Sequence, residues 1–141
     1  EHYYPFKYKV RSVPLNTEKT EYSMVLRLAE QYLIRAEARM HLGREAEAWQ
    51  DVDHVRTVHA KLPNAGEGRL GQGLMEAIAV ERRLEFFHEW GHRWFDLKRW
   101  GAADDVLGGK KAGWRPTAAL LPIPEQEMLS NGNLQPQNEG Y

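Results

Sequence analysis

The chain has 141 residues and a formal net charge of −1, so it is long enough for one domain with a hydrophobic core and has no basic field to attract nucleic acid. It contains no cysteine, which excludes disulfides, thiolate metal sites and cysteine nucleophiles. No apolar run approaches the roughly 20 residues that span a bilayer. Because the sequence opens on Glu1, both a mature product and an excised fragment are compatible with it.

The first predicted element is a short edge strand near the N-terminus. Its apolar residues alternate with Pro5 and with basic residues, and this period of two is typical of a half-buried strand. The proline restricts the strand to the edge of a sheet, because it cannot donate a ladder hydrogen bond. The apolar members of the strand are Tyr4, Phe6, Tyr8 and Val10.

From Met24 the apolar period becomes helical, and the pattern predicts an antiparallel hairpin. The first helix ends at Gly43, where glycine suits a left-handed cap, and the second extends from about Glu45 to His59. The small residues between 36 and 48 are typical of a tetratricopeptide hairpin, which needs several stacked units to be stable, so the chain is predicted to belong to a larger array or to cap one. The apolar stripe of the first helix comprises Val25, Leu28, Ala29, Tyr32, Leu33, Ala36 and Met40.

The remainder of the chain is predicted to alternate short helices with long loops. Residues 62–73 are rich in glycine and form a loop. Residues 120–124 are extended, because each of their two prolines disfavours helix in the residue before it. Further helices are predicted over residues 74–87, 92–100 and 125–129. The predicted fold is therefore all-α, a single domain of residues 1–141 with a tetratricopeptide-like hairpin, long loops and the short N-terminal edge strand.

Residues 88–92, His-Glu-Trp-Gly-His, match the H-E-x-x-H zinc motif. In such a site both histidines lie one helical turn apart, with the glutamate beside the bound water. Gly91 weakens a helix here by about 1 kcal/mol. Phe95 and Lys98 stand where the longer zinc-protease signature has glycine and histidine. We therefore predict no metal, no cofactor and no catalytic residue, with a zinc metalloprotease as the disfavoured alternative.

The charged residues around this motif favour a structural role. Glu81 falls on the apolar stripe of its helix, where a carboxylate costs several kcal/mol unless it is paired. Arg93 and Arg99 on the next helix are suited to bidentate pairing with Glu81, Glu85 or Asp96. The pattern thus predicts a clamp between the third and fourth helices.

Four stretches, taken in order over nearly the whole chain, together resemble one family. The first is 27–38, RLAEQYLIRAEA; the second is ERRLE at 81–85 with EWGHRWFDLKRW at 89–100; the third is LPIPEQE at 121–127; and the fourth is NLQPQNEGY at 133–141. These stretches resemble the C-terminal part of SusD/RagB-type proteins.

The resemblance implies a surface-exposed outer-membrane lipoprotein of Bacteroidetes-type bacteria, α-helical and tetratricopeptide-like. Such a protein binds glycans or other nutrients without catalysis and covers a SusC-like TonB-dependent receptor, to which it delivers them. The chain would be the C-terminal portion, and the lipid anchor would lie outside it. The alternative from another class is a tetratricopeptide-like scaffold that binds only protein.

Trp114 is the candidate ligand-binding residue. It stands in a loop rich in glycine and lysine, outside every periodic apolar stripe. Two placements are open: the ring is buried against the core, as large aromatic side chains mostly are, or it is exposed as a stacking platform. An exposed indole would suit a sugar ring, whose hydroxyl groups would meet Arg115 or Lys111.

Overall fold

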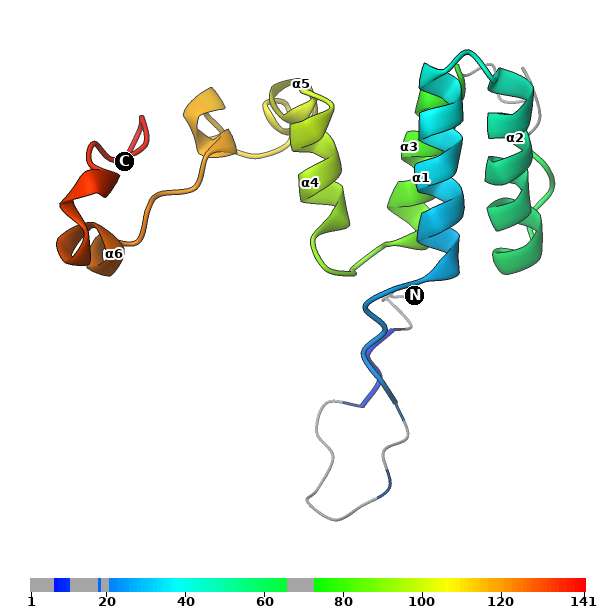
Figure 1. The fold of residues 1–141 in the computed structure, drawn as a ribbon, viewed down its shortest axis with the longest axis horizontal. Coiled ribbons are helices and arrows are strands. Elements are labelled where there is room, and N and C mark those ends of the chain that lie inside the picture. The colour runs from blue at the N-terminus through cyan, green and yellow to red at the C-terminus, as the bar shows by residue number, and fades with distance from the viewer. Residues whose placement is uncertain (1–6, 11–17, 19–20, 66–72) are drawn as a thin grey trace. The chain divides into compact units, whose positions relative to one another are not determined.

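The computed structural model describes residues 7–10, 18, 21–65 and 73–141, and the chain divides into two compact units, Glu1–Arg93 and Trp94–Tyr141 (Figure 1). The described residues contain helices and no strand, which confirms the all-α prediction. Among them, no helix combines the length and the apolar character needed to cross a membrane.

The first unit begins with the predicted hairpin, formed by α1 (Leu28–His41) and α2 (Glu45–His54). Gly43 in the intervening turn has a φ of +73°, so the predicted left-handed cap is confirmed. The π-helix η1 (Val55–His59) continues α2 to the predicted end at His59. The two helices pack directly against each other, as a turn this short requires (Figure 1).

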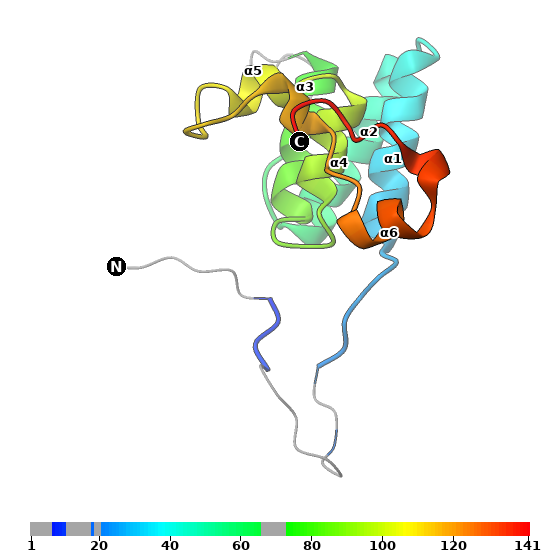
Figure 2. The same ribbon diagram turned by 90° about the vertical axis from the view of Figure 1, so that its left-hand side faces the viewer.

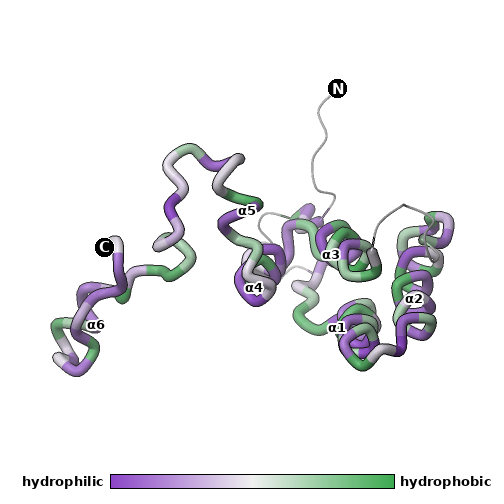
Figure 3. The backbone as a smooth tube through the Cα atoms, turned by 90° about the horizontal axis from the view of Figure 1, so that it is seen from above, coloured by the Kyte–Doolittle hydropathy of each residue, from purple (hydrophilic) through white to green (hydrophobic). Residues whose placement is uncertain are grey.

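Helix α3 (Leu74–Glu85) packs against both hairpin helices, and Figure 3, seen from above, shows the three as neighbouring columns. One apolar core lies among them, with Leu33, Val52 and Ile78 fully buried. The remaining core residues are Ala29, Ala36, Ala48, Trp49, Val55, Ala65, Leu74, Ala77 and Phe86. This three-helix core is what positions the polar groups of the first unit.

The N-terminal part of the first unit differs from the prediction in two ways. Lys7–Val10 adopt no strand, and residues 4–6 of the predicted strand lie outside the described residues. Helix α1 begins at Leu28 and not near Met24, because Arg27 is extended (φ −129°, ψ 138°) with its guanidinium bound to carboxylates of a distant segment. Val25 and Leu28, assigned to the buried stripe, are therefore 58% and 65% exposed.

Helix α4 (His92–Arg99) crosses the boundary between the units, and the second unit continues with elements that are all short. The sequence predicted α6 (Glu125–Ser130). It did not predict the other short helices of this unit, because they are too short to show an apolar period. These unpredicted elements are α5 (Ala103–Leu107), η2 (Pro116–Ala119) and η3 (Gly132–Leu134).

The last residues of the chain are fixed onto the extended run 121–123 by side-chain amides. The amide of Gln137 accepts a hydrogen bond from the Ile123 backbone N–H at 2.8 Å and donates one to its carbonyl oxygen at 2.9 Å. Asn138 donates to the carbonyl oxygen of Leu121 at 2.7 Å. Figure 2 shows the C-terminus beside η2. These amides take the place of a strand partner for a segment that its prolines exclude from a sheet.

Candidate functional site

The zinc-like motif does not lie on one helix. Helix α3 ends at Glu85 and α4 begins at His92, and the turn between them has positive φ angles at His88 (+63°), Trp90 (+39°) and Gly91 (+73°). The arrangement of two histidines one helical turn apart is therefore not formed. In the described parts of the chain, no three His, Asp or Glu side chains are grouped so that they could hold a metal ion. The absence of bound zinc stays a prediction for metal analysis.

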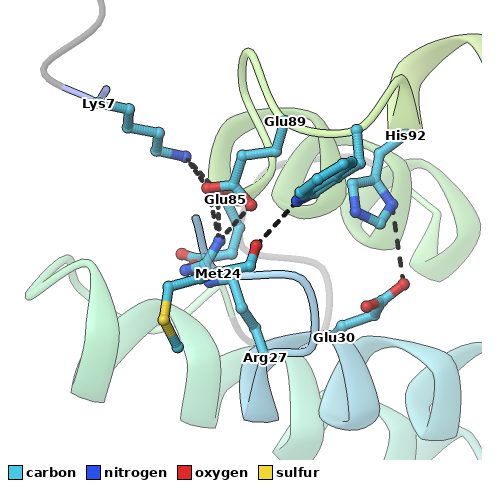
Figure 4. Close-up of polar contacts among 8 residues, drawn as sticks. Lys7, Met24, Arg27, Glu30, Glu85, Glu89 and His92 are labelled. Atoms are coloured by element: carbon cyan, nitrogen blue, oxygen red, sulfur yellow. Dashed lines mark hydrogen bonds and ion pairs between the residues drawn. The ribbon is translucent and has the colours of Figure 1, made fainter. Parts of the chain in front are cut away.

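The same turn carries a polar cluster, which we call the Arg27 cluster: Lys7, Arg27, Glu85 and Glu89 (Figure 4). Arg27 pairs with Glu85 and, at 2.9 Å, with Glu89, and the Lys7 ammonium lies 2.7 Å from the other oxygen of Glu89. Burial raises the pKa of Glu89, but hydrogen bonds from Lys7 and Arg27 outweigh it and hold that pKa below its ordinary value. The cluster joins the segment before α1 to the end of α3.

Two contacts flank this cluster in Figure 4. The indole N–H of Trp90 donates to the Met24 carbonyl oxygen at 2.8 Å. The imidazole Nδ1 of His92 lies 3.7 Å from the carboxylate of Glu30. The glutamate and the second histidine of the zinc-like motif are thus both engaged in contacts that connect it to the start of α1.

Glu81 is buried as predicted, at 2% exposure, but its identified partner is not on α4. Arg56 of η1 lies 3.0 Å from the Glu81 carboxylate and also donates to the Pro63 carbonyl oxygen at 2.8 Å. Burial raises the pKa of Glu81, and Arg56 opposes that rise. The predicted partners were therefore wrong for both carboxylates of α3, since Glu81 binds Arg56 and Glu85 binds Arg27.

Two further buried carboxylates, those of Asp51 and Asp96, also form ion pairs. Asp51 of α2 is 3% exposed and accepts hydrogen bonds from Arg35 at 2.7 Å and from Arg39 at 2.6 Å, which fixes α2 to α1. Asp96 pairs with Arg99 at 3.0 Å, as the sequence suggested, and this pair lies within α4. The carboxylates of the first unit thus stabilise its own three-helix core.

Trp114, the predicted ligand residue, lies in the second unit between α5 and η2, and it is half-buried, between the two predicted placements. Its indole N–H donates to the Asp104 carboxylate at 2.9 Å. Its ring meets that of Trp94 edge to face, with centroids 6.1 Å apart and planes at 76°. Sequence reasoning missed Trp94, because 20 residues and two irregular turns separate the two rings.

The two indoles line a pocket of about 340 Å³, a size typical of small-ligand sites. Of the two basic residues expected near Trp114, Lys111 lines this pocket, whereas the Arg115 guanidinium lies 5.4 Å from the Tyr141 ring centroid. The other lining residues are Ala112, Gly113, Ala118 and Leu121.

Gly108 at the end of α5 lies close to the Trp114 ring. A Cβ atom at this position would lie 2.7 Å from the Asp104 carbonyl oxygen and 3.8 Å from the Trp114 ring. The Gly108 backbone N–H donates to that same carbonyl at 2.8 Å. A side chain at residue 108 would therefore clash with the backbone of α5, whereas its distance to the indole would be an ordinary van der Waals contact.

A second, smaller pocket of about 250 Å³ lies in the first unit. It is lined by Lys7, Tyr8, Lys9, Glu21, Tyr22, Met24, Arg27 and Glu89. Three members of the Arg27 cluster, Lys7, Arg27 and Glu89, line it, and both cations are already paired with the Glu89 carboxylate.

The comparison with protein families decides what kind of chain this is. A model of the SusD family matches residues 1–141. The chain belongs to the SusD family. It is 34% identical to SusD-like protein P2 of Formosa agariphila over 129 residues, which cover 82% of this chain and 25% of that protein. It is 36% identical to SusD-like protein P25 of the same organism over 130 residues, which cover 84% of this chain and 24% of that protein.

The chain thus spans about a quarter of the length of the curated relatives it matches. No solved structure matches it. Within this SusD-family chain the four stretches that carry the resemblance are joined in pairs. Arg27 of the first stretch binds Glu85 and Glu89 of the second, and Gln137 of the fourth binds Ile123 of the third. These contacts give the stretches a structural role, and Trp114 lies outside all of them.

Proposed function

We propose that residues 1–141 form the C-terminal portion, a single domain, of a nutrient-binding lipoprotein at the surface of the bacterial outer membrane. The nutrient is a glycan, and the protein delivers it to a SusC-like TonB-dependent receptor without catalysis of its own. Membership of the SusD family over residues 1–141 supports this proposal.

The observation that carries the glycan assignment is the pair of indoles at the pocket of the second unit. Flat aromatic rings pack against the C–H faces of sugars, and a pocket with few polar groups excludes water from that contact. Trp94 and Trp114 meet at 76°, so they form two walls at a steep angle to each other and not one flat surface. Such a corner suits a single sugar ring with one face on Trp114 and one edge on Trp94.

The test is the affinity of the full-length protein for glycans selected on an array and then measured by calorimetry. Trp114→Ala is expected to weaken binding by about tenfold or more, as truncation of an aromatic anchor does. The matched control is Trp90→Ala, which removes a half-exposed indole from the first unit. Unchanged affinity in Trp114→Ala would remove this residue from the site, and a protein that binds no glycan would favour the protein-only scaffold.

The proposed receptor requires a separate experiment. The full-length protein, solubilised from its native outer membrane in mild detergent, is expected to co-purify with a TonB-dependent receptor encoded beside it. Quantitative mass spectrometry of the purified complex would give their ratio, expected to be one to one. Recovery of the protein without such a receptor would contradict the delivery step but not glycan binding.

A further inference from the structure

The pocket between Trp94 and Trp114 has positive charge without a paired carboxylate. Lys111 is the one charged residue among the seven that line it. The Lys98 ammonium does not line the pocket but lies 5.6 Å from the centroid of the Trp94 ring, which does. Neither lysine forms an ion pair with any residue in the described part of the chain.

The acidic and basic neighbours of the pocket are engaged elsewhere. Asp104 accepts the indole N–H of Trp114 and is not among the lining residues. Arg99 pairs with Asp96, and Arg115 lies over the Tyr141 ring. Lys111 is therefore the cation of the pocket lining that a ligand can approach without first breaking an ion pair, and Lys98 lies over the adjoining Trp94 ring.

A lysine beside an apolar, indole-lined pocket favours a particular ligand chemistry. An ammonium group donates a hydrogen bond to a neutral sugar hydroxyl as well as to a carboxylate or sulfate, but only the anion adds the attraction of opposite charges to that bond. An anionic substituent on the sugar would thus neutralise a positive charge that a neutral ligand would only hydrogen-bond.

We propose that this pocket binds a sugar ring carrying a carboxylate or a sulfate group. The ring packs in the corner between Trp94 and Trp114, and Lys111 binds the anionic group, with Lys98 adding positive potential from the Trp94 wall. This inference rests on the proposed glycan-binding function and specifies the chemical class of its ligand.

The experiment uses calorimetry on the full-length protein with two matched pairs of probes. The first pair is an oligogalacturonate and its methyl ester, which have the same backbone and differ in charge. The second is a sulfated galactan oligosaccharide and its desulfated counterpart. The pair that shows the larger difference identifies the anion as carboxylate or sulfate.

The test variant is Lys111→Met, which keeps the aliphatic stem that lines the pocket and removes the charge. Its matched control is Lys110→Met, the adjacent exposed lysine, which does not line the pocket. We expect Lys111→Met to weaken binding of the charged probe by about tenfold, as loss of a hydrogen bond to a charged group does, and to leave its neutral partner unaffected. Raising the salt concentration should weaken binding of the charged probe in the parent protein and in Lys110→Met, and should have a smaller effect in Lys111→Met.

The outcomes separate this inference from the function on which it rests. Preference for a charged probe that is lost in Lys111→Met and kept in Lys110→Met would support it. Trp114-dependent binding that is equal for the charged and neutral probes, or unchanged in Lys111→Met, would overturn it while the glycan-binding function stands. Failure of the parent protein to bind any of the four probes would overturn it as well, and binding of an unrelated neutral glycan on the array would then show that the function itself survives.

Discussion

In the first unit the buried carboxylates of Asp51 and Glu81 each face an arginine, whereas in the second unit Lys98 and Lys111 lie beside indole rings and form no ion pair with a described residue. Both sets of charged residues lie close to aromatic or apolar surface, but the carboxylates of the first unit are paired with arginines, whereas these two lysines of the second unit are not. The comparison teaches that charge near a hydrophobic surface indicates a ligand site only where it has no partner within the fold.

The largest expected effect tests the structural half of this comparison. Arg56→Met leaves the Glu81 carboxylate buried without its identified partner and should lower the free energy of unfolding by about 3–5 kcal/mol, measured by urea denaturation. The matched control is Arg44→Met, which breaks the Arg44–Glu47 pair at the surface.

The control should change the melting temperature by no more than about two degrees, because solvent screens an exposed pair and the side chains lose entropy in forming it. Equal effects of the two substitutions would mean that burial of Glu81 does not set the importance of its partner, and the contrast between the units would lose its basis.

A smaller effect is expected in the second unit, where shape and not charge positions the site. Gly108→Ala would place a Cβ atom 2.7 Å from the Asp104 carbonyl oxygen, so the end of α5 has to shift. Overpacking of this kind costs about 1–3 kcal/mol, and we expect the lower half of that range for an exposed turn. Gly109→Ala is the control, because a Cβ atom there meets nothing within 4 Å. A lower melting temperature for Gly109→Ala than for Gly108→Ala would contradict the close packing of residue 108 against the Asp104 carbonyl oxygen.

The smallest effect concerns the pH dependence of the Arg27 cluster. The pKa of Glu89 is lower in the folded protein than its ordinary value, so its ion pairs stabilise the fold above the unfolded-state pKa of about 4.3. This stabilisation is lost as the pH falls through the folded-state pKa. Glu89→Gln, measured by urea denaturation between pH 7 and pH 3, should be less stable at pH 7 and should lose less stability on acidification. Parallel curves for the parent and the variant would show that Glu89 is not held in its charged form by Lys7 and Arg27.

The sequence predicted those features that depend on local periodicity. The helices, the cap at Gly43 and the burial of Glu81 all follow from apolar spacing and from the conformational range of glycine. Helix α5 was missed, because a five-residue helix has too few turns to show a period. The start of α1 was predicted too early in the sequence. Arg27 is extended and precedes the helix, and its side chain binds residues 58 and 62 positions away, which no local pattern indicates.

The candidate site was predictable only in part, for a similar reason. Trp114 was identified because no helix or strand requires it. Its partner Trp94 sits on α4 among residues that pack, and nothing in its spacing separates it from Trp90 or Trp100. The same holds for Glu81, whose burial is a local property and whose pairing with Arg56 depends on how the chain returns after η1. The Trp94–Trp114 and Arg56–Glu81 contacts depend on the tertiary fold, so the local sequence pattern does not predict them.

The most direct test of the account is the glycan affinity of the full-length protein in two variants, Trp114→Ala and Arg27→Met, each shown by circular dichroism to be folded at the temperature of measurement. Trp114→Ala removes a lining side chain from the pocket of the second unit, and Arg27→Met changes one in the pocket of the first unit. The account predicts that Trp114→Ala weakens binding by about tenfold, whereas Arg27→Met lowers stability and keeps the affinity within about twofold. Loss of affinity in Arg27→Met with unchanged affinity in Trp114→Ala would place the ligand in the first unit and contradict the account.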